Sequence, residues 1–268
     1  MLDVIDLGYP EATCHLPLLN AECTVRCFTV GETTSLRTSN TFGVTLINNI
    51  NETIYNCIQQ KPEDLFDDYN KFRKVLPTKD RDALLYSILE ASDELKQVIP
   101  MTCPNCSNTQ ELEVNLQDCF DAVLYDGEPG GILNEEEVYT FETPKVIINV
   151  TLKVPTLDRE RRVLMAVKNI QAVDPLLLSS LYTIHKINFV DKRDNKDLGT
   201  IDANNFESLQ IFLRRLKLKQ LKDIDNHYVE TLGRYGLSLK FSYVCNRCNQ
   251  VNNDIPLDLI QFFFQAIV

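Results

Sequence analysis

Two pairs of cysteines are the part of this sequence best suited to do chemistry. Each pair is a Cys-x-x-Cys motif, formed by Cys103 with Cys106 and by Cys245 with Cys248. The two intervening residues let a tight turn direct both sulfurs at one ion, and four thiolates suit a tetrahedral zinc ion. The sequence therefore predicts one zinc site shared by the two pairs, although residues 107–244 separate them.

The chemistry of such a site is structural, because four thiolates leave zinc no open position for water or substrate. Three other interpretations stay open at this point: two dithiol redox pairs, a metal site that also recruits Cys119, and plain free thiols. A redox pair is typical of a helix N-terminus that follows a strand. Here residues 111–116, which alternate as a strand does, follow the first pair instead.

Composition narrows the classes of protein that fit. The chain has 268 residues, 44% of them hydrophobic and 24% charged, which is ordinary for a globular protein with its own core. A net charge of −11 counts against a nucleic-acid platform. Nine cysteines cannot all pair, and the start of the chain is acidic rather than a secretory leader. We expect a reduced protein made in the cytoplasm.

Known catalytic and membrane signatures are missing from the sequence. It contains no P-loop, dinucleotide-binding fingerprint or nucleophile elbow, and no histidine stands beside a candidate base. No apolar run approaches the ~20 residues that span a bilayer. The sequence therefore predicts a non-enzyme with no small-molecule substrate and no membrane association.

Hydrophobic periodicity predicts the elements that must position the cysteines. Apolar residues recur at helical spacing over residues 41–60, 65–75 and 80–98, whereas residues 22–28 alternate and residues 1–20 read as irregular. Acidic side chains near these helix starts, among them Asp80 and Asp82, are expected to be solvated.

The second half of the chain mixes both periodicities. Residues 146–154, 184–191 and 237–243 predict strands, and residues 156–170 and 202–224 predict helices. The resulting fold class is α+β. A mainly helical N-terminal part (1–100) and an α/β part (139–236) are joined by a zinc-ribbon-like four-cysteine clasp built from residues 101–122 and 237–260.

Two features are candidate partner-binding surfaces. The predicted helix over residues 202–224 carries the concentrated basic patch of this acidic chain on its outer face: Arg214, Arg215, Lys217, Lys219 and Lys222. Such a patch binds an acidic protein or nucleic acid, or is a solvated face whose long side chains cover apolar neighbours. The chain closes on Phe262, Phe263 and Phe264, for which core packing is the equal alternative.

Several stretches together resemble a known family. They are residues 25–32 (Val-Arg-Cys-Phe-Thr-Val-Gly-Glu), 101–106 (Met-Thr-Cys-Pro-Asn-Cys), 113–116 (Glu-Val-Asn-Leu), 243–248 (Tyr-Val-Cys-Asn-Arg-Cys) and the phenylalanine tail. This set is similar to the baseplate hub and hub-assembly proteins of contractile-tailed bacteriophages of the T-even type. The most specific part is the Cys-Pro-x-Cys motif with its flanks, which also occurs in unrelated zinc ribbons.

The resemblance implies a function without chemistry. It implies a structural or assembly component of the hub or wedge region of a tail baseplate, which contacts other tail and baseplate proteins. Such a protein is made in the host bacterial cytoplasm and located in the virion. A nucleic-acid-binding zinc-ribbon accessory protein and a thiol redox protein are the alternative functions, of which the first would bind through the basic patch with a strong salt dependence.

Overall fold

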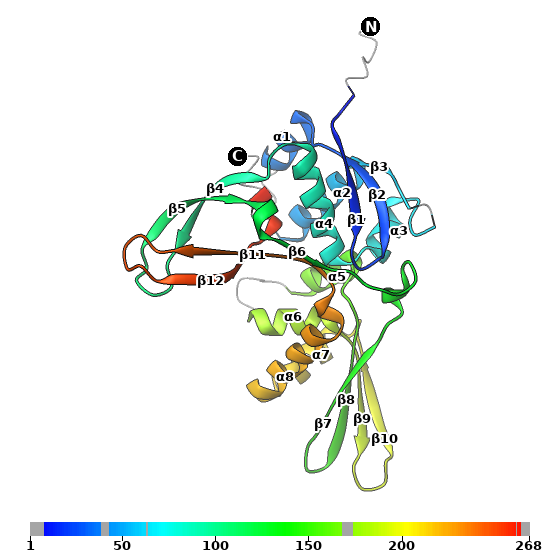
Figure 1. Cartoon of the computed structure of the whole chain (residues 1–268). Coiled ribbons are helices and arrows are strands. Elements are labelled where there is room, and N and C mark those ends of the chain that lie inside the picture. Colours follow the sequence, from blue (N-terminus) through cyan, green and yellow to red (C-terminus); the bar gives the residue numbers. More distant parts are fainter. Residues whose placement is uncertain (1–7, 39–42, 63, 168–173, 261, 264–268) are drawn as a thin grey trace.

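The computed structural model describes residues 8–38, 43–62, 64–167, 174–260 and 262–263. Helices and strands are mixed along the whole chain, which confirms the mixed helix-and-sheet class (Figure 1). The strands form four antiparallel sheets among these residues. The helices gather in the body, from which the longer strands project.

The first sheet has the order β1-β2-β3 and is built from β1 (Glu11–Leu16), β2 (Ala21–Arg26) and β3 (Ile58–Gln60). Cys14 lies opposite Cys23, and these two thiols are buried on the face that also carries Val25. The expected irregular start of the chain is therefore wrong for β1. Its alternation covers only a few residues between two prolines, too short a run to be recognised from periodicity alone.

Four helices follow, α1 (Val30–Thr38), α2 (Val44–Cys57), α3 (Tyr69–Val75) and α4 (Thr78–Ala91). The predicted helix over residues 80–98 is too long. α4 stops because Asp93 adopts a left-handed backbone (φ 57°), and the Glu94 N–H returns to the Leu89 carbonyl at 2.9 Å. The rest of the predicted helix is a strand, β4 (Lys96–Thr102).

A four-stranded sheet forms the second large unit, with order β10-β9-β8-β7. Its strands are β7 (Glu137–Glu142), β8 (Val146–Leu152), β9 (Ile184–Asp191) and β10 (Asp197–Asp202). Ring contacts join it to the neighbouring helices: Phe189 meets Phe212 of α7 at 5.4 Å between centroids, and Tyr139 meets His227 of α8 at 5.5 Å. The far ends of these strands project from the body (Figure 1).

The helices beside this sheet begin at polar caps that the sequence supplies. They are α5 (Leu157–Ala166), α6 (Pro175–Thr183), α7 (Phe206–Leu213) and α8 (Leu218–Glu230). The side chains of Thr156, Asp174 and Asn205 each accept a backbone N–H of the first turn of α5, α6 and α7. Pro175 adds a φ suited to the first position of α6.

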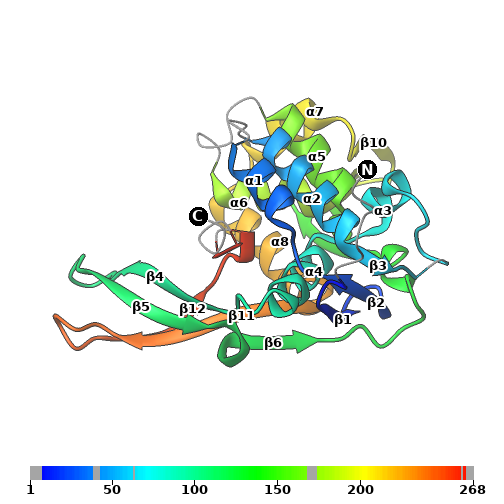
Figure 2. The same ribbon diagram turned by 90° about the horizontal axis from the view of Figure 1, so that it is seen from above.

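Two hairpins extend from one side of the body as an arm, whereas the four-stranded sheet points downward in Figure 1 (Figures 1 and 2). One hairpin pairs β4 with β5 (Thr109–Asn115). The other pairs β11 (Gly236–Val244) with β12 (Val251–Pro256) and adds β6 (Phe120–Val123) at its base, giving the order β12-β11-β6. The arm is defined here as these two hairpins.

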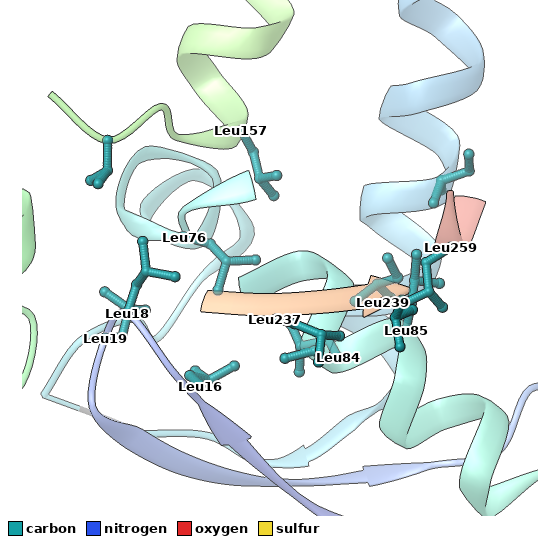
Figure 3. Close-up of a cluster of buried hydrophobic side chains, with 14 of the residues drawn as sticks. Leu16, Leu18, Leu19, Leu76, Leu84, Leu85, Leu157, Leu237, Leu239 and Leu259 are labelled. Carbon is teal, nitrogen blue, oxygen red and sulfur yellow. The ribbon is translucent and has the colours of Figure 1, made fainter. Parts of the chain in front are cut away.

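One hydrophobic cluster runs through the body and joins distant parts of the chain. Figure 3 shows leucines from β1 and the turn after it, from the end of α3, from α4 and α5, from β11 and from the C-terminal segment gathered in one place: Leu16, Leu18, Leu19, Leu76, Leu84, Leu85, Leu157, Leu237, Leu239 and Leu259. These residues come from the predicted helical part, the α/β part and the clasp alike. The domain boundaries drawn from the sequence therefore stay a prediction.

Buried polar contacts reinforce this interleaving. Asp80 is fully buried, and its two oxygens accept the backbone N–H groups of Leu18 and Leu19 at 2.9 Å each, so the solvated role expected for it is wrong. Burial raises the pKa of Asp80 to about 7, although the two N–H groups oppose the rise. The next residue, Arg81, forms a buried ion pair with Glu160 of α5 at 2.7 Å.

Candidate metal centre at the end of the arm

Each Cys-x-x-Cys motif forms the turn of one hairpin of the arm. Cys103 and Cys106 lie between β4 and β5, and Cys245 and Cys248 lie between β11 and β12. The sequence predicts strands after both pairs and before the second, and the structure adds the strand β4 before the first. For the first pair this corrects the expected helix up to residue 98. A zinc ribbon, in which two such hairpin turns share one ion, has this arrangement.

The two turns have the same backbone geometry. In each, the N–H of the first cysteine donates to the carbonyl five residues later, at 2.8 and 2.9 Å. The N–H four residues on donates back to the carbonyl of the first cysteine at 2.9 Å in both turns. That fourth residue, Ser107 or Asn249, has a left-handed backbone with φ of 54° or 56°. The turns therefore present their sulfurs as two copies of one unit.

The four sulfurs meet at the end of the arm. Cys106 Sγ lies 3.6 Å from Cys245 Sγ, and Cys103 Sγ lies 3.8 Å from Cys248 Sγ, with all four atoms within 4.8 Å of one another. Zinc bonded to four sulfurs at about 2.3 Å in a tetrahedron sets neighbouring sulfurs about 3.8 Å apart. The residues present therefore fit a four-coordinate zinc ion.

Hydrogen bonds lower the pKa of two of the four cysteines, Cys245 and Cys248. Backbone N–H groups of Cys248 and Arg247 donate to Cys245 and lower its pKa to about 6. The Gln250 N–H and the Asn105 amide, 3.6 Å from the sulfur, lower the pKa of Cys248.

The neighbouring sulfurs raise the pKa of one cysteine of the cluster, Cys106. The Asn108 N–H favours the thiolate of Cys106, but burial and hydrogen bonds with the other three sulfurs raise its pKa to about 12. Four adjacent thiols cannot all ionise against one another, and a cation removes that repulsion.

Gln110 is a residue of this site that sequence reasoning missed. Its side chain is almost fully buried between the hairpins, donating to the Val244 carbonyl at 3.1 Å and accepting the Asn246 N–H at 2.7 Å. Asn108 adds a bond to the Asn246 side chain at 2.8 Å. The one signal was position, because Gln110 occupies the apolar phase of β5 that it shares with Val114.

The other cysteines of the described chain lie away from the cluster. Cys119 is buried in the short 3-10 helix η1 (Leu116–Cys119), where its thiol donates to the Asn115 carbonyl at 3.3 Å. Cys14 and Cys23 face each other in the first sheet. The structure therefore does not bring Cys119 to the four sulfurs, and the alternative that recruits it is not favoured.

The predicted basic patch lies on the turn between α7 and α8 and on the start of α8, rather than on one continuous helix. Residues 214–217 form a turn between α7 and α8, so the expected continuous helix over residues 202–224 is wrong. Ile211, near the end of α7, is 48% exposed. All five basic side chains are exposed: Arg214, Arg215, Lys217, Lys219 and Lys222.

The C-terminal phenylalanines are core residues as far as the structure describes them. Phe262 and Phe263 are buried, and the Phe263 ring lies 4.8 Å from that of Phe28 between centroids. Their expected role as an exposed docking site is therefore not supported. Phe264 lies outside the described residues.

These features define a mixed helix-and-sheet scaffold with a candidate four-cysteine metal centre on a projecting arm. A family model described as "T4 bacteriophage base plate protein" matches residues 9–265. The chain therefore belongs to this family, which confirms the resemblance and supports a structural role in a phage baseplate at the virion tail. Neither the curated proteins nor the solved structures gave a match.

Membership of this family suggests a non-enzymatic role and implies contacts with other phage tail proteins. No helix in the described part of the chain is long and apolar enough to cross a bilayer.

Proposed function

We propose that the protein is a structural or assembly component of the hub or wedge region of a phage tail baseplate, with one structural zinc ion held by Cys103, Cys106, Cys245 and Cys248. The spacing of the four sulfurs carries the metal part of this proposal. Family membership supports the baseplate part. Zinc supplies a crosslink here, because four thiolates fill its coordination.

The zinc ion would act within the arm. Its two hairpins belong to separate sheets, so no backbone ladder joins them among the described residues. Near the cysteines they are joined by side-chain bonds from Gln110 and Asn108. The ion would therefore hold two hairpin ends together, a narrower task than the clasp between the two halves of the chain that the sequence predicts.

Partner contacts are proposed for the exposed basic patch on α8 and on the turn that precedes it. Its five side chains take part in no ion pair among the described residues, and the rest of the chain is acidic. An acidic surface of another tail or baseplate protein is the partner that this charge suits. Nucleic acid is the alternative partner, which the net charge of −11 disfavours.

Metal content tests the zinc site. We expect one zinc per chain in the purified protein by elemental analysis, and its loss in Cys103→Ser and Cys245→Ser. Cys119→Ser is the matched control, because that thiol is buried outside the cluster and should leave the zinc in place. Metal-free wild-type protein whose paired thiols cycle between dithiol and disulfide would support the redox alternative instead.

Partner recovery tests the baseplate role. The tagged full chain, produced during infection, should co-purify with other baseplate proteins. A variant with Arg214, Arg215 and Lys219 changed to glutamine should recover fewer of them. Binding of the purified chain to DNA or RNA at low salt would instead favour the nucleic-acid alternative. Recovery of no tail protein at all would contradict the proposed role.

A further inference from the structure

An apolar groove lies between the first sheet and the base of the arm. It has a volume of about 430 Å³, with α4 as its floor, β1 on one side and β6 with the residue after it on the other. Phe120 and Leu124 line it although they are 46% and 51% exposed. The name α4 groove is used below for this cavity. Exposed apolar surface that lines a concave site is typical of a protein-binding site.

The α4 groove is acidic as well as apolar. Glu90 lines it, and Glu22 lies beside its lining residue His15, with 3.9 Å between the carboxylate and the imidazole Nδ1. No lysine or arginine is among its lining residues. Within the described chain, β6 is also the last strand of its sheet, so its outer backbone edge carries no strand partner. The occupant that this site suits has apolar side chains flanked by positive charge.

The turn between α7 and α8 has that composition. Ile211 and Leu218 are 48% and 63% exposed there, so two aliphatic side chains stand beside the basic ones. Arg214 and Arg215 follow Ile211 by three and four residues, and share its side of the helix end. This segment, residues 211–219, is called the basic corner below.

The α4 groove and the basic corner lie on opposite sides of one molecule. Figure 2 shows α7 on one side of the body and β6 on the other, with the core between them. A single chain therefore cannot seat its own corner in its own groove, but two chains can. We propose that the α4 groove binds the basic corner of a second copy of this chain, head to tail.

This inference rests on the proposed role of the basic patch as a partner surface and names the partner. Because the two contacting surfaces differ, the first contact would leave a free corner on one copy and a free groove on the other. Such a heterologous interface builds a closed ring or an open chain rather than a symmetric dimer.

Analytical ultracentrifugation of the zinc-loaded full chain tests the inference. We expect association that grows with protein concentration and weakens as salt is added. Leu124→Ser in the groove and Leu218→Ser in the corner should each weaken association about tenfold or more, because each removes a buried aliphatic contact. Glu90→Lys and Arg215→Glu should each weaken it, and the two changes in one chain should restore part of the loss.

Mixing the variants isolates the head-to-tail geometry. Leu124→Ser and Leu218→Ser chains lack different halves of the contact, so a mixture should form one-to-one dimers at a concentration at which each variant alone is mainly monomeric. Lys145→Glu, an exposed residue between β7 and β8 that belongs to neither surface, is the control and should associate as the wild type does. Circular dichroism spectra identical to that of the wild type show that the serine variants are folded.

Two results would overturn the inference. One is a wild-type chain that stays monomeric at low salt, and the other is association that the groove and corner variants leave unchanged. In either case the recovery of baseplate proteins described above still tests the proposed function, because it does not depend on self-association. A monomeric chain whose corner variants fail to recover baseplate proteins would assign the basic corner to another protein.

Discussion

Buried polar side chains join segments of this protein that the backbone ladders leave separate. Asp80 on α4 accepts two N–H groups from the turn after β1, and Gln110 bridges the two hairpins of the arm. A buried polar group without its partner costs about 1–3 kcal/mol, so each bridge fixes one arrangement of the segments it joins. Single substitutions at these residues should therefore have measurable effects on stability that can be traced to one local contact.

The pH dependence of stability should report the buried carboxyl group of Asp80. Burial raises its pKa from 3.8 to about 7 in the folded state, so the folded state favours the proton. The stability that Asp80 contributes is then complete below about pH 4 and is lost as the pH rises through 7. The difference in unfolding free energy between wild type and Asp80→Asn should fall over that range by a few kcal/mol, measured by urea denaturation at each pH.

Asp68 provides a control of opposite sign. It caps α3, and the Lys71 N–H lowers its pKa, so its contribution is present at neutral pH and is lost as the pH falls. The difference between wild type and Asp68→Asn should rise with pH. For Asp80, a difference that also rises with pH would show that its two N–H bonds outweigh burial and keep it ionised.

Gln110→Ala should weaken the arm without touching a cysteine. The substitution leaves the Val244 carbonyl and the Asn246 N–H without their partner, at a cost of about 1–3 kcal/mol. It should also speed the transfer of zinc to a chelator, measured with a colorimetric dye. Gln97→Ala on the neighbouring strand β4 is the control, because its side chain forms no hydrogen bond with another described residue. Equal zinc-transfer rates in the two variants would refute this role for Gln110.

At this scale the sequence predicted the chemistry but not the bridges. The two cysteine pairs can be recognised in the sequence by residue type and spacing, and the structure brings their sulfurs together. From the sequence, Asp80 looks like any acidic residue in the first turn of a helix. The N–H groups that it accepts belong to Leu18 and Leu19, which are 62 and 61 residues away in the chain. Long-range partners leave no local signal.

Among the elements, the hairpins depend on the cluster more than the body does. Zinc removal by a chelator should expose the amides of the two cysteine turns to hydrogen exchange, because no backbone ladder joins the hairpins there. The amides of β8 and β9 should keep their protection, since both strands are paired on each side. Hydrogen exchange followed by mass spectrometry on the zinc-loaded and zinc-free chains measures both regions at once.

Two additions make this prediction decisive. Adding zinc back should restore protection of the turns, and the Cys119→Ser chain should match the wild type before and after chelation. Loss of protection in β8 and β9 together with the turns would mean that the metal stabilises the whole fold. Unchanged turns would mean that side-chain bonds alone hold the arm.

The elements that the sequence mistook are those whose ends depend on tertiary context. Periodicity predicted α2 closely but ran α4 on into β4, because Leu95 continues the apolar spacing past the left-handed residue Asp93. It also joined α7 to α8, because residues 214–217 suit a helix and only packing shows the break. Strong helix formers conceal a turn in a sequence.

At the scale of the whole molecule, the C-terminal segment closes the core. Leu259, Phe262 and Phe263 are buried, and Phe263 meets Phe28 from the other end of the chain. A sequence cannot distinguish such a plug from an exposed docking tail, since both are short apolar runs beside a terminus. The distinction lies in whether a matching cavity exists elsewhere in the fold, which is a property of tertiary structure.

Two phenylalanines should therefore behave in opposite ways when each is changed to alanine. Phe263→Ala should lower the unfolding free energy by about 3–5 kcal/mol, because it removes a fully buried ring and leaves a cavity. Phe120→Ala should change it by well under that amount, because its ring is 46% exposed. Denaturation of the zinc-loaded chains measures both values, and similar values would contradict the assignment of Phe263 to the core.

The same two substitutions should have the opposite order of effect on self-association, with Phe120→Ala the more damaging. Phe120→Ala leaves a stable chain with a damaged α4 groove, so it should weaken self-association while the melting temperature stays near that of the wild type. Phe263→Ala leaves both proposed docking surfaces intact, so the fraction that remains folded should associate with wild-type affinity. Because stability and association separate in this way, a loss of baseplate assembly can be traced either to an unfolded body or to a missing contact.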